Sequence, residues 1–267
     1  MDHADVVSVW AALAAATFPL LFLVSAPYGK LVRGGWWGPE VNGRVGWFLQ
    51  EIVAPLSLTL AVVRGAGVFS FPSVDGRIAH DVDAASPPPL AKLFIVCWWA
   101  HYLNRAVLYP LTRRMSPTTG PVVATAVCFN LVNGALVGAE LAHGHSAHLV
   151  RPGLRALVGG LALFCAGAGV NITADRTLRR LRRGPEDCGH YVPRGGLFEC
   201  VTCPHYLGEV MEWTGFAVAT QTRAGWAFAF WTFANLLPRA VAYRAWYRDK
   251  FGDKYPKGIR AMIPFVW

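Results

Sequence analysis

Long apolar runs separated by short polar loops dominate the order of residues along this chain. A helix needs about 20 apolar residues to cross the hydrocarbon core of a bilayer. Seven runs approach or exceed this length, at residues 6–27, 46–70, 90–111, 120–143, 153–175, 206–222 and 224–245. The sixth run is the weakest, because it contains Glu209 and Glu212. The pattern predicts an all-α integral membrane protein, a bundle of seven transmembrane helices in one domain of residues 1–267.

Composition and charge support this prediction and add an orientation. The chain is 54% hydrophobic and only 15% charged, whereas soluble domains carry about 25% charged residues. Its net charge of +9 does not indicate nucleic-acid binding, because the basic residues lie in short loops between the apolar runs. Outside the seven runs, sixteen Lys and Arg lie on one side and three on the other. This asymmetry predicts a lumenal or outside N-terminus and a cytosolic C-terminus.

The second run opens with GWFLQEIVAP, which places Gln50 and Glu51 side by side at the start of an apolar helix. One interpretation is a solvated helix end, where the positive end of the backbone dipole stabilises an acid. The alternative is that Glu51 faces the interior of the bundle, where an ionisable group is costly and is usually functional. The third run is similar, because its WWAHYLNRAVLYP segment crowds polar side chains into an apolar helix. At 100° per residue Tyr102, Arg105 and Tyr109 would share one face.

Polar side chains at the end of the fifth run suggest an anionic cofactor. Asn171 and Asp175 are four residues apart, and Arg179 and Arg182 continue the same stripe. An amide and a carboxylate can bind a ribose or a base edge, and arginines can bind phosphates. The arginines alone would also fit the cytosolic end of a span. A Rossmann domain is not indicated, because no GxGxxG motif follows a strand.

The segment from residue 189 to the end of the sixth run is dense in reactive side chains. Cys200 and Cys203 form a CxxC pair near histidines, but a second pair at zinc-finger spacing is missing, so we expect no metal. With six cysteines mostly in spans or on the cytosolic side, disulfides are not expected. Glu209 and Glu212 precede a wholly apolar stretch, which suggests that at least one faces a polar cavity. In the seventh run a stripe at four-residue spacing holds Arg239, Tyr243 and Tyr247.

These motifs together resemble the steroid 5-alpha-reductase family. GGLFECVTCPHYLGEVMEW, LPRAVAYRAWY and the ending KYPKGIRAMIPFVW are similar to the C-terminal domain of that family, and FLQE and HYLNRAVLYP to its N-terminal half. The resemblance covers almost the whole chain and looks closest to the plant-type, brassinosteroid-pathway branch. It implies a seven-helix bundle and transfer of hydride from NADPH to the carbon beta to the ketone of a 3-oxo-delta-4 steroid.

The resemblance also implies that the two halves of the chain have different functions. Residues of about 1–115 would form the substrate side and about 116–267 the NADPH side. Glu51 and Tyr102 match the catalytic pair that holds the steroid ketone, with Gln50, Trp47 and Arg105 beside them as substrate-binding residues. The positions expected to bind NADPH are Tyr28, Asn171, Asp175, Arg179, Arg182, His205, Glu209, Arg239, Tyr243 and Tyr247. His205 departs from the family pattern, in which Asn is commoner.

Several alternatives stay open at this stage. Within the family, reduction of a polyprenol or of an enoyl thioester is possible. The CPxYxGE-like region is also similar to membrane sterol reductases and isoprenylcysteine methyltransferases, although FLQE and HYLNR argue against both. A lipid-binding membrane protein without enzymatic activity is the remaining class. We expect a monomer that binds a lipophilic steroid in the endoplasmic reticulum membrane, or in the plasma membrane if the source is bacterial.

Overall fold

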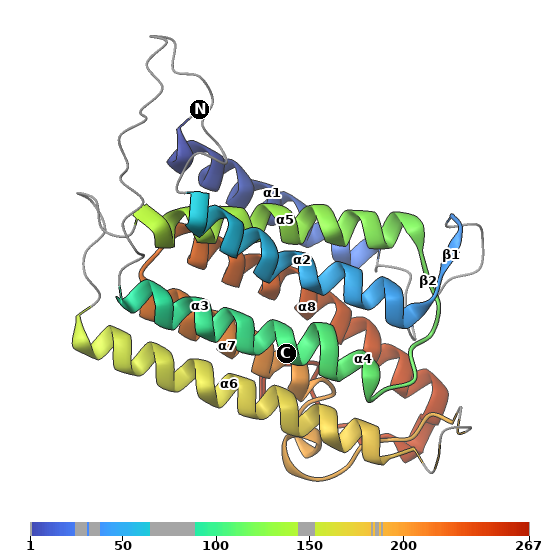
Figure 1. Cartoon of the computed structure of the whole chain (residues 1–267). Coiled ribbons are helices and arrows are strands. Elements are labelled where there is room, and N and C mark those ends of the chain that lie inside the picture. Colours follow the sequence, from blue (N-terminus) through green and yellow to red (C-terminus); the bar gives the residue numbers. More distant parts are fainter. Residues whose placement is uncertain are drawn as a thin grey trace. The chain divides into compact units, whose positions relative to one another are not determined.

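The computed structural model describes residues 2–24, 31, 38–64, 89–143, 153–182, 184, 187 and 189–266. It is mostly helical (Figure 1). The helices are α1 His3–Leu23, α2 Gly43–Arg64, α3 Pro89–Tyr102, α4 Tyr109–Leu111, α5 Gly120–His143, α6 Leu154–Arg180, α7 Pro204–Thr220 and α8 Arg223–Phe251. A π-helical turn, η3 Leu103–Leu108, joins α3 to α4. Short elements are the strands β1 Glu40–Val41 and β2 Thr118–Thr119 and the 3₁₀ turns η4 Gly196–Glu199 and η5 Gly252–Lys254.

Four of these helices are long and apolar enough to cross a membrane: α1, α2, α5 and α6. The chain is therefore an all-α membrane protein. Each of the seven predicted ranges overlaps a helical segment, although α3 has only 14 residues before the π-turn and α7 has 17. Residues 25–27 of the first range and 65–70 of the second lie outside the described residues. The number of seven spans and the orientation in the membrane stay predictions.

The chain forms two compact units, which we describe separately. Unit 1 comprises residues 1–10, 35–153 and 220–227, and unit 2 comprises residues 11–34, 154–219 and 228–267. The predicted catalytic and substrate-binding residues all fall in unit 1. The predicted cofactor-binding residues that the structure describes all fall in unit 2.

Helix α2 is the centre of unit 1, packing against α5 on one side and against α3 and η3 on the other. Small residues bring α5 close to α2. A Cβ added at Gly134 would lie 2.5 Å from the Ala54 carbonyl, and one at Gly138 would lie 2.5 Å from the Leu58 carbonyl. Close backbone approach at small residues is how helices associate where no hydrophobic effect drives them together. The antiparallel pairing of β1 with β2 joins the starts of α2 and α5.

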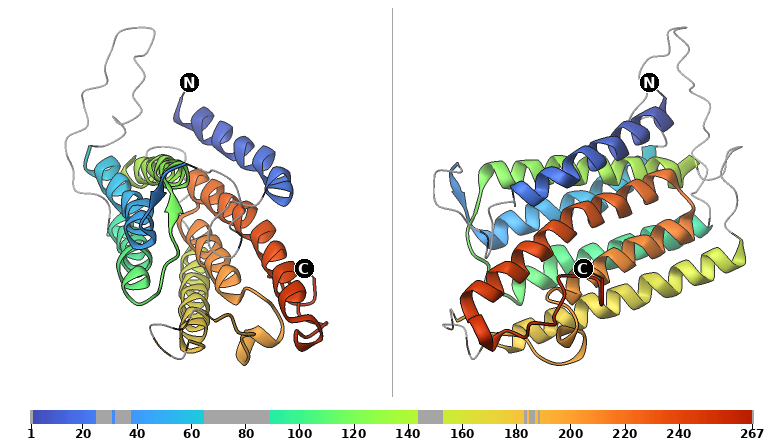
Figure 2. Two further views of the ribbon diagram at one scale, coloured as in Figure 1. Left: turned by 90° about the vertical axis from the view of Figure 1, so that its right-hand side faces the viewer. Right: turned by 180° about the vertical axis from the view of Figure 1, so that it is seen from behind.

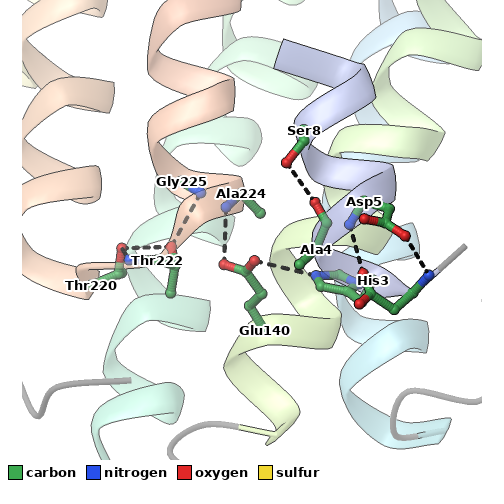
Figure 3. Close-up of polar contacts among 10 residues, drawn as sticks. His3, Ala4, Asp5, Ser8, Glu140, Thr220, Thr222, Ala224 and Gly225 are labelled. Carbon is green, nitrogen blue, oxygen red and sulfur yellow. Dashed lines mark hydrogen bonds and ion pairs between the residues drawn. The ribbon is translucent and has the colours of Figure 1, made fainter. Parts of the chain in front are cut away.

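One end of unit 1 is held by the buried carboxylate of Glu140, near the end of α5 (Figure 3). This carboxylate accepts a hydrogen bond from the backbone N–H of Ala224 at 2.9 Å and lies 3.2 Å from Nε2 of His3. The Thr222 hydroxyl accepts the N–H of Gly225 at 3.1 Å. The first N–H groups of a helix have no partner within the helix, so these side chains satisfy the start of α8.

In unit 2, α7 lies between α6 and α8 (Figure 2). Glycines at seven-residue spacing bring the backbones of α6 and α7 together, two on each helix: Gly160, Gly167, Gly208 and Gly215. A Cβ at Gly208 would lie 2.5 Å from the backbone nitrogen of Asn171, and one at Gly215 would lie 2.6 Å from the Gly160 carbonyl. The two helices run antiparallel, so Asn171 of α6 lies beside the first turns of α7.

The C-terminal segment folds back onto the start of α7. The N–H of Thr202 binds the Arg260 carbonyl at 2.8 Å, and the N–H of Cys203 binds the Ala261 carbonyl at 3.1 Å. Ala261 and Met262 are buried beside Cys203 in a cluster completed by Leu236, Leu237 and Ala240 of α8. The segment after α8 is thus part of the core of unit 2.

The glycine contacts lead to a first prediction. A Cβ at Gly167 would meet the backbone nitrogen of Glu212, whereas a Cβ at Gly169 on the same helix meets nothing within 4 Å. We expect Gly167→Ala to lower the free energy of unfolding by about 1–3 kcal/mol, because α6 and α7 must separate. Gly169→Ala, the matched control, should change it by less than about 1 kcal/mol, in the stabilising direction. Thermal unfolding of both variants in detergent measures this. Equal effects would refute the close-packing argument.

Candidate active site

The Gln50–Glu51 pair lies one turn before a proline inside α2. Pro55 has no N–H to donate to the Glu51 carbonyl. The neighbouring Gln50 carbonyl accepts the side-chain amide of Asn130 on α5 at 2.7 Å, and the Ser57 hydroxyl donates to the Asn130 carbonyl at 3.3 Å. Gln50 and Glu51 are both half-buried. Their backbone is therefore fixed from α5 at the point where Pro55 removes one hydrogen bond of the helix.

Tyr102 ends α3 immediately before the π-turn. Its side chain is 3% exposed, and its ring packs against those of Trp98 and His101, with centroids 5.4 Å and 5.0 Å away. The expected uninterrupted α-helical periodicity of this segment is wrong between Leu103 and Leu108, where the helix is π-helical. Pro110 gives the physical reason, because its ring would clash with the carbonyl four residues earlier in a regular helix. Single π-turns occur frequently at functional sites.

Arg105 lies within the π-turn and is 8% exposed. Its guanidinium carbon lies 5.0 Å from the centre of the Trp47 ring and 4.6 Å from that of Tyr109. Arg113 lies 4.3 Å from the Tyr109 ring centre. Aromatic faces attract a guanidinium electrostatically, and more strongly when water is excluded. The Trp47 and Tyr109 rings therefore provide partners for the buried guanidinium.

In unit 2, a buried amide joins the polar residues of α6 and α7. The side-chain amide of Asn171, 2% exposed, donates to the His205 carbonyl at 2.9 Å and lies 3.4 Å from a Glu209 carboxylate oxygen. The glycine contacts make this possible, because the Asn171 backbone touches Gly208. The structure thus brings together three of the predicted cofactor residues from segments more than 30 residues apart.

Arg239 of α8 binds two tyrosine hydroxyls, one on α7 and one on its own helix. Its guanidinium is buried, with Nε donating to the Tyr206 hydroxyl at 3.0 Å and Nη2 donating to the Tyr243 hydroxyl at 3.1 Å. The rings of Tyr206 and Tyr243 stack with centroids 6.0 Å apart. Tyr206 was missed by sequence reasoning. It is the Tyr of the CPxYxGE-like region, and its place beside His205 was the signal that could have identified it.

The remaining predicted cofactor residues are distributed along the ends of α6 and α8. Asp175 is half-buried, and Arg179 and Arg182 are exposed. Tyr247 is buried in an aromatic cluster, stacked on Tyr255 with centroids 5.5 Å apart. Tyr28 lies outside the described residues. Among the described residues no group of three His, Cys, Asp or Glu side chains could hold a metal ion. Of the CxxC pair, Cys203 is buried against Met262. Cys188 lies outside the described residues.

The side chains gathered in unit 2 suit a phosphorylated dinucleotide. A buried guanidinium held by two phenol hydroxyls is a preorganised donor for an anion or a polar ring substituent. The amide and carboxylate pair of Asn171 and Glu209 can exchange hydrogen bonds with sugar hydroxyls or a carboxamide. The exposed arginines at the end of α6 add positive charge. The donor set therefore fits NADPH.

Tyr255 connects the C-terminal segment to this unit. Its hydroxyl lies 2.8 Å from the Thr202 hydroxyl, which also donates to the Arg260 carbonyl at 2.9 Å. Burial raises the pKa of Tyr255, and the hydrogen bond with Thr202 opposes this shift. The burial of the phenol is the larger effect, so the neutral form is favoured in the folded protein.

Comparison with known proteins identifies the family. Residues 117–267 match the family described as 3-oxo-5-alpha-steroid 4-dehydrogenase. A steroid 5-alpha-reductase DET2 of Gossypium hirsutum is 40% identical over 261 residues, covering 96% of this chain and 93% of the relative. The protein of the same name in Arabidopsis thaliana is 39% identical over 260 residues, covering 94% and 91%. The 3-oxo-5-alpha-steroid 4-dehydrogenase 1 of Bos taurus is 36% identical over 257 residues, covering 96% and 93%.

The helices and these relatives define a membrane oxidoreductase. More specifically, the chain belongs to the 3-oxo-5-alpha-steroid 4-dehydrogenase family, and the resemblance predicted from its motifs is confirmed.

The raised pKa of Tyr255 leads to a second prediction. Below pH 9 we expect Tyr255→Phe to lower the free energy of unfolding by about 1 kcal/mol, through loss of the bond with Thr202. In the unfolded chain the phenol ionises near pH 10, below its folded pKa, so wild-type stability falls as the pH rises above about 10. The Phe variant does not lose stability in this way, because it has no phenol at position 255 to ionise. The difference between the two proteins should therefore shrink between about pH 9 and 11, as measured by denaturant unfolding. A constant difference would contradict the burial argument.

Proposed function

We propose that this protein reduces the delta-4 double bond of a 3-oxo-steroid with NADPH, giving the 5-alpha-reduced 3-oxo-steroid. The observation that carries the proposal is the 40% identity, over 96% of the chain, to a protein named as a steroid 5-alpha-reductase. The chemistry of both groups of side chains supports it. We further propose that the protein is a monomer of the endoplasmic reticulum membrane. Residues of about 1–115 would form the substrate-binding half, and residues of about 116–267 the NADPH-binding half.

At the substrate end, Glu51 and Tyr102 hold the steroid ketone. Addition of hydride to the beta carbon, C5, moves the electrons of the C4–C5 double bond toward C3, so negative charge develops on the ketone oxygen. A hydrogen-bond donor aimed at that oxygen stabilises the transition state most where water is excluded. The phenol of Tyr102 is such a donor and is 3% exposed. A proton then adds to C4. We propose Gln50, Trp47 and Arg105 as further substrate-binding residues.

At the cofactor end, the buried guanidinium of Arg239 with its two tyrosine hydroxyls supports the proposal. When bound, NADPH supplies the hydride. Asn171, Glu209 and His205 would orient the cofactor, while Asp175, Arg179 and Arg182 lie toward the end of α6 where its phosphates and ribose can be bound. Tyr28, Tyr243 and Tyr247 complete the proposed set, to which we add Tyr206.

The test of this function is incubation of the purified protein with NADPH and a panel of testosterone, progesterone, campestenone and a polyprenol, with products identified by mass spectrometry. We expect a mass gain of two hydrogens on one or more of the enones and none on the polyprenol. Reduction of the polyprenol alone would replace the steroid by another substrate of the family. No reduction of any compound, together with no NADPH binding, would favour a lipid-binding protein.

The positive charge near α6 leads to a third prediction, that NADPH is preferred to NADH. Arg179, Arg182 and Arg239 provide more cationic groups than a pyrophosphate requires, and the excess suits the 2′-phosphate. We expect kcat/KM to be at least about tenfold higher with NADPH, since one charged hydrogen-bonded pair contributes about 1.5–3 kcal/mol. Steady-state kinetics with both cofactors measure this ratio. Equal values would eliminate the proposed phosphate-binding role.

A fourth prediction separates the proposed ketone-holding residues from the proposed cofactor-binding residues. Glu51→Gln and Tyr102→Phe should each lower turnover by up to about 10²–10³-fold, the usual cost of removing an oxyanion donor, with little change in the Kd of NADPH. Asp175→Ala should do the reverse and weaken NADPH binding first. The control is Thr125→Val on α5, whose exposed hydroxyl donates to the Pro121 carbonyl of its own helix. If Glu51→Gln reduces enones at the wild-type rate, Glu51 does not hold the ketone.

A further inference from the structure

The π-turn before Pro110 changes which N–H groups can reach the Arg105 carbonyl. In an α-helix this carbonyl would accept the N–H of Tyr109, but that N–H binds the Asn104 carbonyl instead. In the π-helical pattern the donor would be residue 110. That residue is proline, which has no N–H. The usual backbone donors of either helical pattern are therefore diverted or missing.

Trp47 of α2 supplies a donor to this carbonyl. Its indole Nε1–H donates to the Arg105 carbonyl oxygen at 2.9 Å. The Trp47 ring also packs against Tyr109, with centroids 5.1 Å apart, and lies under the Arg105 guanidinium at 5.0 Å. A single side chain thus contacts the backbone, the cation and the aromatic ring of the same turn.

The position of Trp47 relates this contact to the proposed catalytic pair. Trp47 and Glu51 are four residues apart in one helix and therefore lie on the same face of α2. Tyr102 directly precedes the first residue of the π-turn. A π-turn contains one extra residue, and its loss would rotate the segment on one side of it by about 100° relative to the other. Holding the π-turn against α2 therefore fixes the direction of Tyr102 relative to Glu51.

We propose that Trp47 is a positioning residue, which holds the π-turn through its indole N–H and so aligns Tyr102 with Glu51. This inference rests on the proposed function and gives Trp47 a role other than direct substrate binding. The bond matters because lipid contains no water to satisfy a carbonyl that the helix leaves open.

The test removes the indole N–H and leaves a smaller aromatic ring at the same position. Trp47→Phe keeps an aromatic ring against Arg105 and Tyr109 and removes the donor. We expect kcat for enone reduction to fall roughly tenfold, the effect of an unsatisfied buried carbonyl, while the KM for NADPH stays within about twofold. The matched control is Trp99→Phe. Trp99 donates its indole N–H to the Thr59 hydroxyl at 2.9 Å, across the same pair of helices but away from the π-turn. It should keep wild-type kcat.

A second background tests the hydrogen bond without relying on activity. Pro110→Ala restores an N–H, so the Arg105 carbonyl has a backbone donor whether the turn remains π-helical or becomes α-helical. Trp47→Phe should therefore lower the thermal midpoint of the otherwise wild-type protein, and lower it by less than half as much in the Pro110→Ala background. An equal fall in the thermal midpoint in both backgrounds would show that Trp47 acts only by ring packing, and this would overturn the proposal. A wild-type kcat for Trp47→Phe would also overturn it. A wild-type protein inactive on every enone would refute the proposed function instead, and the thermal comparison would still test the bond.

Discussion

The structure depends on hydrogen bonds from side chains to the backbone of neighbouring helices. In a membrane interior a buried side-chain amide, or a carbonyl that its own helix leaves open, must find its partner within the protein. Trp47 donates to the Arg105 carbonyl, Asn130 to the Gln50 carbonyl and Asn171 to the His205 carbonyl. Each acceptor belongs to a segment that carries a proposed site residue. The bonds that satisfy these helices also fix the side chains of the site.

Close helix contacts make these bonds possible. In unit 1 the glycines of α5 let its backbone touch α2, and in unit 2 the glycines of α6 and α7 do the same. An amide side chain is short, so Asn130 and Asn171 reach a carbonyl on the next helix only where the backbones approach. Small residues therefore serve the site indirectly, by bringing the polar residues of two helices within hydrogen-bonding distance.

The sequence predicted the helices well, because a membrane helix is marked by the length of its apolar run. The family and most of the proposed site residues also followed from short motifs. The π-turn was not predicted, since it depends on Pro110 together with a donor, Trp47, that lies 58 residues before the carbonyl it binds. Tyr206 was missed for a similar reason. Its hydroxyl joins the proposed site only by accepting a hydrogen bond from Arg239, which lies 33 residues later in the chain. Periodicity describes one helix and carries no information about partners on another.

The central claim is that hydride moves from NADPH to C5 of a 3-oxo-delta-4 steroid. The most direct measurement uses NADPH with deuterium at both C4 positions of the nicotinamide ring and progesterone in ordinary water. We predict a product with one deuterium, located at C5 on the alpha face by NMR, and an ordinary hydrogen added at C4. Deuterium at C4, or a reduced product without deuterium, would contradict the proposed reaction.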